Sequence, residues 1–168
     1  MATHQIPILG WQTRPDDSGD VFFEPYSVKA TNDLWDYMVL IFNDTATRIG
    51  VRGSFIVPQN YVGSPVIKPL WTATAITGDV EWDFDYRAIG GDDTESLDQA
   101  TAQESVNTND TAPSAIHERM LPSLALTAGN LAAGDIVQYE LFRDGTDAGD
   151  TMAAAAILHE LIFEYADA

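Results

Sequence analysis

The amino-acid sequence predicts an all-β fold: an antiparallel sandwich of two sheets, jelly-roll-like, with about eight strands. Three observations support this prediction. Polar and apolar residues alternate strictly over residues 80–88. Other short apolar runs are rich in β-branched and aromatic side chains, which favour strands. Segments rich in Asn, Asp, Gly and Pro separate these runs, and such segments are typical of turns.

The strand over residues 80–88 is the most clearly marked element. Its even-numbered residues are apolar and its odd-numbered residues are charged. Successive side chains of a strand point to opposite faces, so this strand has one core face and one solvent face. Similar signals predict further strands at residues 21–23, 36–43, 49–57, 66–75, 115–120 and 136–143.

Residues 90–114 interrupt the strand pattern. The segment is polar, and Leu97 and Val106 are its only large apolar residues. We predict a long exposed excursion here, with one helical turn at most after Thr94. A linker between two domains is the alternative. Because the strands on either side fit one sheet system, we predict a single sandwich domain over residues 19–168.

The C-terminal segment fits two structures. Ile157, Leu158 and Leu161 repeat at helical spacing and follow a run of four alanines, which are good helix formers. Residues 161–165 are rich in strand formers instead. We therefore favour a closing strand over a helix.

Charge excludes several classes of partner. The chain carries 26 acidic and 8 basic residues, a net charge of −18. Nucleic-acid binding requires clustered cations, and an anionic membrane surface repels a protein of this charge. We therefore expect neither nucleic acid nor membrane as a partner. Cysteine is absent, which excludes disulfides, thiol catalysis and thiolate metal sites.

Known catalytic motifs are absent from the sequence. There is no G-x-S-x-G elbow, no H-E-x-x-H helix, no P-loop and no G-x-G-x-x-G turn. Asp83 and Asp85 share one strand face at a separation of about 7 Å, which a hydrolase with two carboxylates could use. Because this face is a regular charged face, we interpret both as solvated side chains and expect no enzymatic activity.

An acidic loop supplies the metal-site hypothesis. Asp144, Asp147 and Asp150 recur at every third position, with Gly145 and Gly149 between them. Three carboxylates on a tightly turning chain could ligate a hard cation such as Ca²⁺. The alternative is an acidic turn in which Asp and Gly satisfy turn geometry. We expect no obligatory cofactor, and Ca²⁺ is the candidate ion.

The first 18 residues carry large apolar side chains without strand periodicity. Proline and glycine interrupt the four residues Ile6, Ile8, Leu9 and Trp11. Burial of each such side chain is worth roughly 1.5–3 kcal/mol, so these residues should not remain in water. Two outcomes stay open: an edge strand of the same sandwich, or an extended arm over residues 1–18 whose apolar residues anchor to a neighbouring chain.

Four stretches, taken in order, resemble a known family. They are a Pro-Gln-Asn-Tyr-Val-Gly turn at 58–63, Leu-Trp-Thr-Ala at 70–73, a strand that opens Gly-Asp-Val-Glu-Trp at 78–82, and a strand between the Gly-Asp at 134–135 and the Arg-Asp-Gly at 143–145. This order resembles small jelly-roll proteins encoded among the virion genes of tailed bacteriophages, including head decoration, or cement, proteins. The resemblance implies a structural protein without enzymatic role or cofactor.

The resemblance further implies a capsid decoration protein that binds the major capsid protein, or another virion protein, and stabilises the head lattice. It also implies a homotrimer that is assembled in the host cytoplasm and located in the virion. A tail or fibre component is a neighbouring alternative. An alternative from another class is a carbohydrate-binding β-sandwich module, in which Tyr61, Trp71 or Tyr86 would stack on a sugar if they faced solvent.

Overall fold

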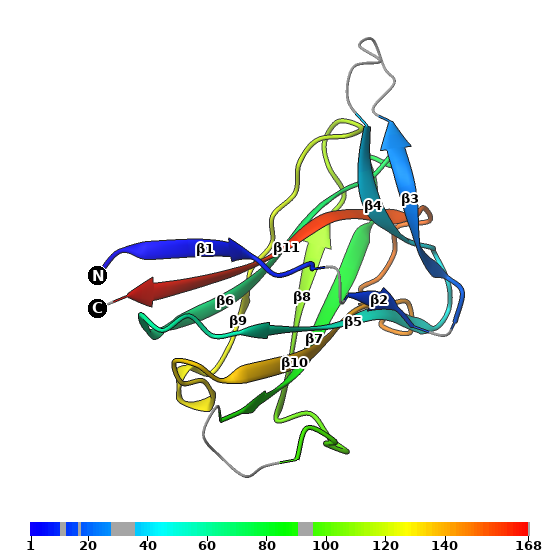
Figure 1. The fold of residues 1–168 in the computed structure, drawn as a ribbon. Helices are drawn as coiled ribbons and strands as arrows, with labels where there is room; N and C mark the ends of the chain where they lie inside the picture. Colours follow the sequence, from blue (N-terminus) through cyan, green and yellow to red (C-terminus); the bar gives the residue numbers. More distant parts are fainter. Residues whose placement is uncertain (11–12, 17, 28–35, 91–95, 168) are drawn as a thin grey trace.

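The computed structural model of the protein describes residues 1–10, 13–16, 18–27, 36–90 and 96–167. Two antiparallel β-sheets form a sandwich, as Figure 1 shows, and the predicted all-β, jelly-roll-like fold class is confirmed. The described residues form eleven strands and one 3₁₀ turn, η1 (Ala128–Asn130), and contain no α-helix. Accordingly, none of them belongs to a helix long and apolar enough to cross a membrane.

The six-stranded sheet is organised around its last strand. Its members are β1 (Thr3–Pro7), β3 (Val21–Ser27), β4 (Asp36–Phe42), β6 (Tyr61–Thr72), β9 (Leu124–Ala125) and β11 (Ala156–Asp167). β6 pairs with β11 along one edge, while β4 and β1 pair with the beginning and the end of its other edge. The two chain termini therefore lie side by side, as the blue and red strands of Figure 1 show.

The five-stranded sheet carries the most regular register of the molecule. Its members are β2 (Arg14–Pro15), β5 (Arg48–Ile56), β7 (Asp79–Ile89), β8 (Glu104–Thr111) and β10 (Ile136–Asp144). β10 lies at its centre and pairs with β5 on one side and β7 on the other, without a register shift. An uninterrupted antiparallel ladder fixes which side chains share a face, so the outer surface of this sheet is well defined.

The core between the sheets uses the residues that the alternating pattern indicated. The even-numbered residues of β7 from Val80 to Tyr86 are all buried. Trp82 packs edge-on against Phe42 and Trp71, with ring centroids 5.3 and 5.8 Å apart. Edge-to-face aromatic pairs of this kind add to the stability that burial supplies. The closing strand is also confirmed, because β11 buries Leu158, Leu161 and Phe163 completely.

Two elements differ from the sequence prediction. The polar excursion at 90–114 contains β8, an edge strand in which half-buried residues alternate with exposed ones. An edge strand needs little apolar surface, which is why its composition is that of a loop. The strand predicted at 115–120 is wrong. Its segment turns back on itself, with His117 at a φ of 67°, and only Met120 forms an isolated bridge, with Trp71.

The N-terminal segment joins its own domain. β1 pairs with β11 over five residues, Ile8 is a core residue, and Ile6 and Leu9 pack against the core. Of the two outcomes that the sequence left open, the structure therefore has the edge strand rather than an interaction arm. Burial against β11 already removes these apolar side chains from water. Trp11, the fourth predicted interaction residue, lies outside the described residues.

Candidate functional site

The outer face of the five-stranded sheet gathers polar side chains in cross-strand rows. Residues paired across an antiparallel ladder point to the same face. Because Val137, Tyr139 and Leu141 of β10 are buried in the core, the alternate residues of β10 and their partners point outward. One outward row is Arg14, Arg52, Glu140 and Asp85, and the next is Ser54, Gln138 and Arg87.

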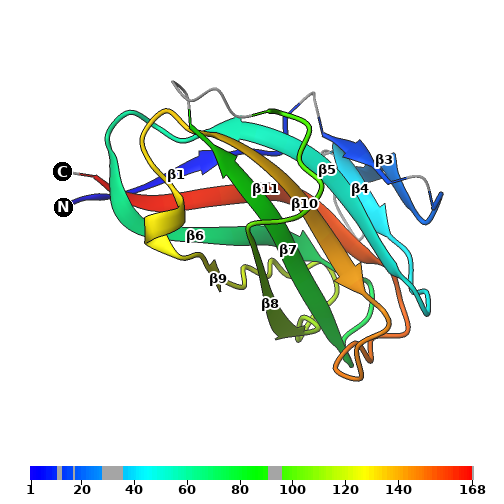
Figure 2. The same ribbon diagram turned by 90° about the horizontal axis from the view of Figure 1, so that it is seen from below.

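A pocket lies where residues 96–103, which precede β8, cross this face. Figure 2 shows these residues, in green, passing in front of β10 and β7. Three hydrogen bonds attach them to the sheet: Gln138 Nε2 donates to the Leu97 carbonyl at 3.0 Å, the Gln103 amide donates to the Tyr86 carbonyl at 2.8 Å, and the Ala88 amide donates to Gln103 Oε1 at 3.1 Å. The pocket has a volume of about 490 Å³, within the range of small-ligand sites.

We call this cavity the sheet pocket. Polar side chains dominate its lining, and alanine, glycine and two core tyrosines supply the rest. The polar members are Arg14, Arg52, Ser54, Asp85, Arg87, Gln99, Thr101, Gln138 and Glu140. Hydrogen-bond donors and acceptors are thus interleaved across four strands and one loop.

Two polar atoms in the pocket wall have no hydrogen-bond partner. They are Asp85 Oδ1 and Arg87 Nε, both buried, whereas the other oxygen of Asp85 accepts a hydrogen bond of 2.9 Å from Arg48. Buried polar groups are almost always paired, so each exception requires an explanation, such as a bound water, ion or ligand. The wall therefore holds an unused donor and an unused acceptor two residues apart on β7.

The condition for sugar stacking on Tyr61, Trp71 or Tyr86 is not met. All three are core residues, so none of them faces solvent as a stacking platform. The outward ring of Phe142 is itself covered by the Arg48 guanidinium, 3.8 Å from the ring centroid. The described pocket lining consequently offers polar recognition rather than a stacking surface.

Asp83 and Asp85 both form ion pairs with the side chain of Arg48. Arg48 Nε donates to Asp83 and Arg48 Nη1 donates to Asp85, both at 2.9 Å. A hydrolytic pair must instead flank the scissile bond, with one carboxyl protonating the leaving group. Both side chains therefore act in the structure as partners of Arg48, on the face that the alternating pattern predicts to be solvated.

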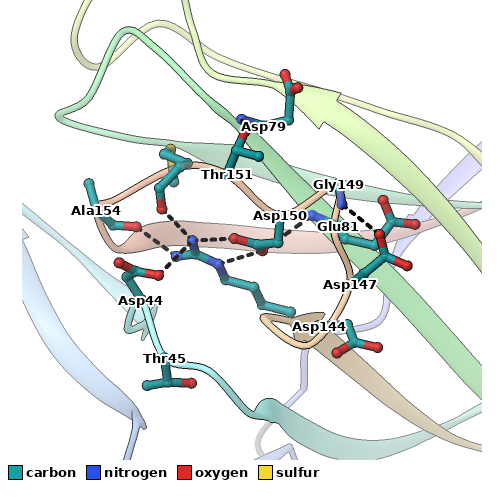
Figure 3. Close-up of polar contacts among 12 residues, drawn as sticks. Asp44, Thr45, Asp79, Glu81, Asp144, Asp147, Gly149, Asp150, Thr151 and Ala154 are labelled. Carbon is teal, nitrogen blue, oxygen red and sulfur yellow. Dashed lines mark hydrogen bonds and ion pairs between the residues drawn. The ribbon is translucent and has the colours of Figure 1, made fainter.

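The acidic loop forms turns that its own carboxylates hold. Asp144 accepts hydrogen bonds from the Thr146 amide and hydroxyl, and Asp147 accepts one of 2.7 Å from the Gly149 amide. Figure 3 shows the third carboxylate, Asp150, turned away from the other two. Among the described residues, no group of three or more acidic or histidine side chains is arranged to hold a metal ion.

Asp150 instead neutralises a buried arginine. Its two oxygens accept from Nε and Nη2 of Arg143 at 2.8 and 2.7 Å. The remaining guanidinium donors bond the Met152 and Ala154 carbonyls, each at 2.6 Å, so the arginine fastens the loop that precedes β11. The predicted Ca²⁺ ligand Asp150 is thus already bound in an ion pair, and the turn interpretation of the loop fits its geometry.

A buried carboxylate, Glu81, lies close to other acidic side chains near this loop. Glu81 is only 7% exposed and lies near Asp147, Asp83 and Asp144. Burial raises the pKa of Glu81, and repulsion from these three carboxylates raises it further, although a hydrogen bond with Asn109 opposes the shift.

Comparison with known proteins identifies structural relatives only. No protein-family model and no curated protein sequence matches the chain. A family 35 carbohydrate-binding module from Clostridium thermocellum superposes with a TM-score of 0.55 at 9% identity, covering 97% of this chain and 98% of the module. A CBM35 from Paenibacillus barcinonensis gives 0.52 at 11% identity, with 97% and 98% covered.

The xylan-binding domain CBM22-1 of Paenibacillus barcinonensis Xyn10C is a third similar structure. It gives a TM-score of 0.51 at 14% identity and covers 93% of this chain and 86% of that domain. At such low identities the likeness establishes the sandwich fold and nothing finer.

Proposed function

We propose that the protein is a non-catalytic carbohydrate-binding module that holds a saccharide in the sheet pocket. The coarse fold supports this proposal, because three domains of the same architecture are carbohydrate-binding modules by their names. A fold hosts many functions, however, so the argument depends on the site.

The observation that carries the proposal is the unused donor and acceptor in the pocket wall. Arg87 Nε and Asp85 Oδ1 lack partners, and the side chains around them are densely polar. A hydroxyl group both donates and accepts hydrogen bonds, so a polyhydroxylated ligand can satisfy both kinds of atom once the two buried groups turn towards the pocket. An apolar ligand would leave them unpaired at a cost of about 1–3 kcal/mol each.

A glycan array followed by isothermal titration calorimetry tests the proposal. The variant Ala100→Trp places an indole in the pocket lining, and we expect it to abolish binding of any glycan that the array identifies. Ala133→Trp is the matched control, since Ala133 is exposed on a loop outside the pocket lining. Absence of binding across the array, or equal binding by A100W, would contradict the proposal.

The virion role that the resemblance implies stays a prediction, as do the homotrimer and the capsid partner. Its expected anchor has no counterpart in the described N-terminal residues, where Ile6, Ile8 and Leu9 pack on their own sandwich. Co-sedimentation with capsid particles would test it independently of the sheet pocket.

A further inference from the structure

Building on the proposed function, we propose that the sheet pocket selects acidic saccharides and that Arg87 and Arg14 bind their carboxylate groups. The ligand class is a chain of uronic acid residues, in which each sugar carries one planar, singly charged carboxylate. Three independent features of the pocket support this specificity.

The first feature is the concentration of cations. The chain has 8 basic residues against 26 acidic ones, yet three arginines, Arg14, Arg52 and Arg87, line this single pocket. In a protein of net charge −18, the surface as a whole repels an anionic ligand. A local cationic cluster therefore marks the place where such a ligand could be accepted.

The second feature is that two of these arginines lack a carboxylate partner. Arg52 is paired with Glu140, whereas neither Arg14 nor Arg87 forms an ion pair within the part of the chain that the structure describes. Three further cations are neutralised: Arg48 by Asp83 and Asp85, Lys68 by Glu164 at 2.7 Å and Arg143 by Asp150 at 2.7 Å, whereas the exposed Arg119 outside the pocket forms no ion pair among the described residues. With so many carboxylates available, an unpaired guanidinium with a buried, unbonded Nε is conspicuous.

The third feature is a pair of like charges. Arg14 of β2 lies directly opposite Arg52 of β5 in the ladder. Like charges at directly opposed positions destabilise a sheet, and Glu140 compensates the pair only from the far side of Arg52, so an anion bound beside Arg14 would reduce the remaining repulsion. The proposed ligand supplies that anion.

Carboxylate fits this site better than more highly charged groups. A guanidinium binds a carboxylate through two parallel hydrogen bonds, which neither lysine nor a neutral donor reproduces. Asp85 and Glu140 in the lining reduce the net charge of the pocket to about one, which penalises multiply charged clusters. The same two acidic side chains can accept hydrogen bonds from sugar hydroxyls.

The placement of the two arginines suggests an extended ligand. β5 and β10 separate β2 from β7, and Arg87 lies two residues beyond Asp85, which shares a row with Arg14, so the backbones of Arg14 and Arg87 are about 16 Å apart at the usual strand geometry. A single sugar ring is too small to bridge this distance. Consecutive uronate residues across the strands would present a carboxylate to each end of the pocket.

The test compares acidic polysaccharides with neutral polymers of the same backbone. Polygalacturonate, alginate and glucuronan are each titrated by calorimetry beside their carboxyl-reduced forms, with dextran sulfate as a further arm. Physiological ionic strength is used because it screens the long-range repulsion from the protein's net charge more than contacts in the pocket. We expect at least one uronate polymer to bind, with at least tenfold weaker affinity for its reduced form.

Variants locate the specificity. Arg87→Gln and Arg14→Gln should each weaken uronate binding at least tenfold, and Arg87→Lys should restore only part of it because it retains charge but not the bidentate fork. Arg119→Gln makes the same charge change on an exposed residue outside the pocket and should leave affinity unchanged. R14Q also relieves the like-charge pair, so its melting temperature should not fall. If R87Q folds poorly, the R14Q variant still tests whether a pocket arginine contributes to uronate binding.

Each contrary result has a distinct meaning. Equal binding of acidic and reduced polymers overturns the carboxylate inference but leaves the carbohydrate-binding proposal standing. Equal binding of dextran sulfate and uronates overturns the preference for carboxylate. Binding of neutral glycans alone overturns the acidic specificity, and binding of no saccharide overturns both proposals. Equal losses in R119Q and R87Q would overturn the assignment to the pocket.

Discussion

The buried ion pair between Arg143 and Asp150 provides a sharp test of how the fold is held together. The side chains of Arg143 and Asp150 are 1% and 2% exposed, and the guanidinium also bonds two backbone carbonyls (Figure 3). Asp150→Ala removes the nearest counter-charge and leaves a cation inside the sandwich, with Asp44 at 3.5 Å as its remaining acidic neighbour.

The expected loss follows from the burial of the pair. Breaking a buried pair by removing one partner costs about 3–5 kcal/mol, since the remaining charge is uncompensated. For a domain of this size each kcal/mol lowers the melting temperature by about 2–4 °C, so we expect D150A to melt roughly 6–20 °C lower. Urea unfolding should show the same loss of free energy as a lower midpoint with an unchanged slope.

Two further variants complete the test. Asp147→Ala is the control, because Asp147 is exposed and bonds only its own loop, and it should cost less than about 1 kcal/mol. The double variant Arg143→Met with Asp150→Leu removes both charges and should be more stable than D150A alone. A loss of stability in D150A no greater than that in D147A would show that the buried ion pair does not stabilise the fold.

Three other predictions concern stability. Gly145→Ala should destabilise the domain by more than 1 kcal/mol, because its methyl group would overlap the Thr45 carbonyl oxygen, whereas Gly129→Ala meets open space and should be nearly neutral in urea unfolding. Deletion of residues 1–9 should lower the melting temperature of the isolated domain by several degrees, because Ile8 belongs to its core; an unchanged value would restore the arm hypothesis. The pKa of Glu81 is raised by folding, so its charge destabilises the native state above its folded pKa and ceases to do so as pH falls through that value. Glu81→Gln should therefore raise the melting temperature at pH 7.5, with the difference closing towards pH 4.5, and a pH-independent difference would contradict this cause.

Much of the fold could be predicted from local sequence because its strands alternate regularly. Residues 80–88 define both faces of β7 without any reference to the rest of the chain. The edge strands β1 and β8 are harder to predict from the sequence. An edge strand needs only one partner strand and little apolar surface, so its composition resembles that of a loop. Whether the N-terminal residues complete their own sheet is decided by the distant β11, which local patterns do not reveal.

The candidate site depended on topology that the sequence does not contain. Arg52 and Arg87 lie within predicted strands, and the charged-face position of Arg87 was visible from its alternation. That β10 separates their strands, and that Arg14 pairs beside Arg52, are non-local facts. The alternation over residues 80–88 places Tyr86 on the core face, whereas no local pattern decides the orientation of Tyr61 and Trp71, which are buried as well.

The most direct test of saccharide binding in the sheet pocket is a ¹H–¹⁵N correlation spectrum recorded with and without a uronate oligosaccharide. Shifted signals should cluster at residues 52–54, 85–87, 99–102 and 138–140, and include the side-chain Nε–H of Arg87, which has no hydrogen-bond partner in the free protein. Shifts confined to the six-stranded sheet or to the 144–150 loop, with the Arg87 signal unmoved, would contradict saccharide binding in this pocket.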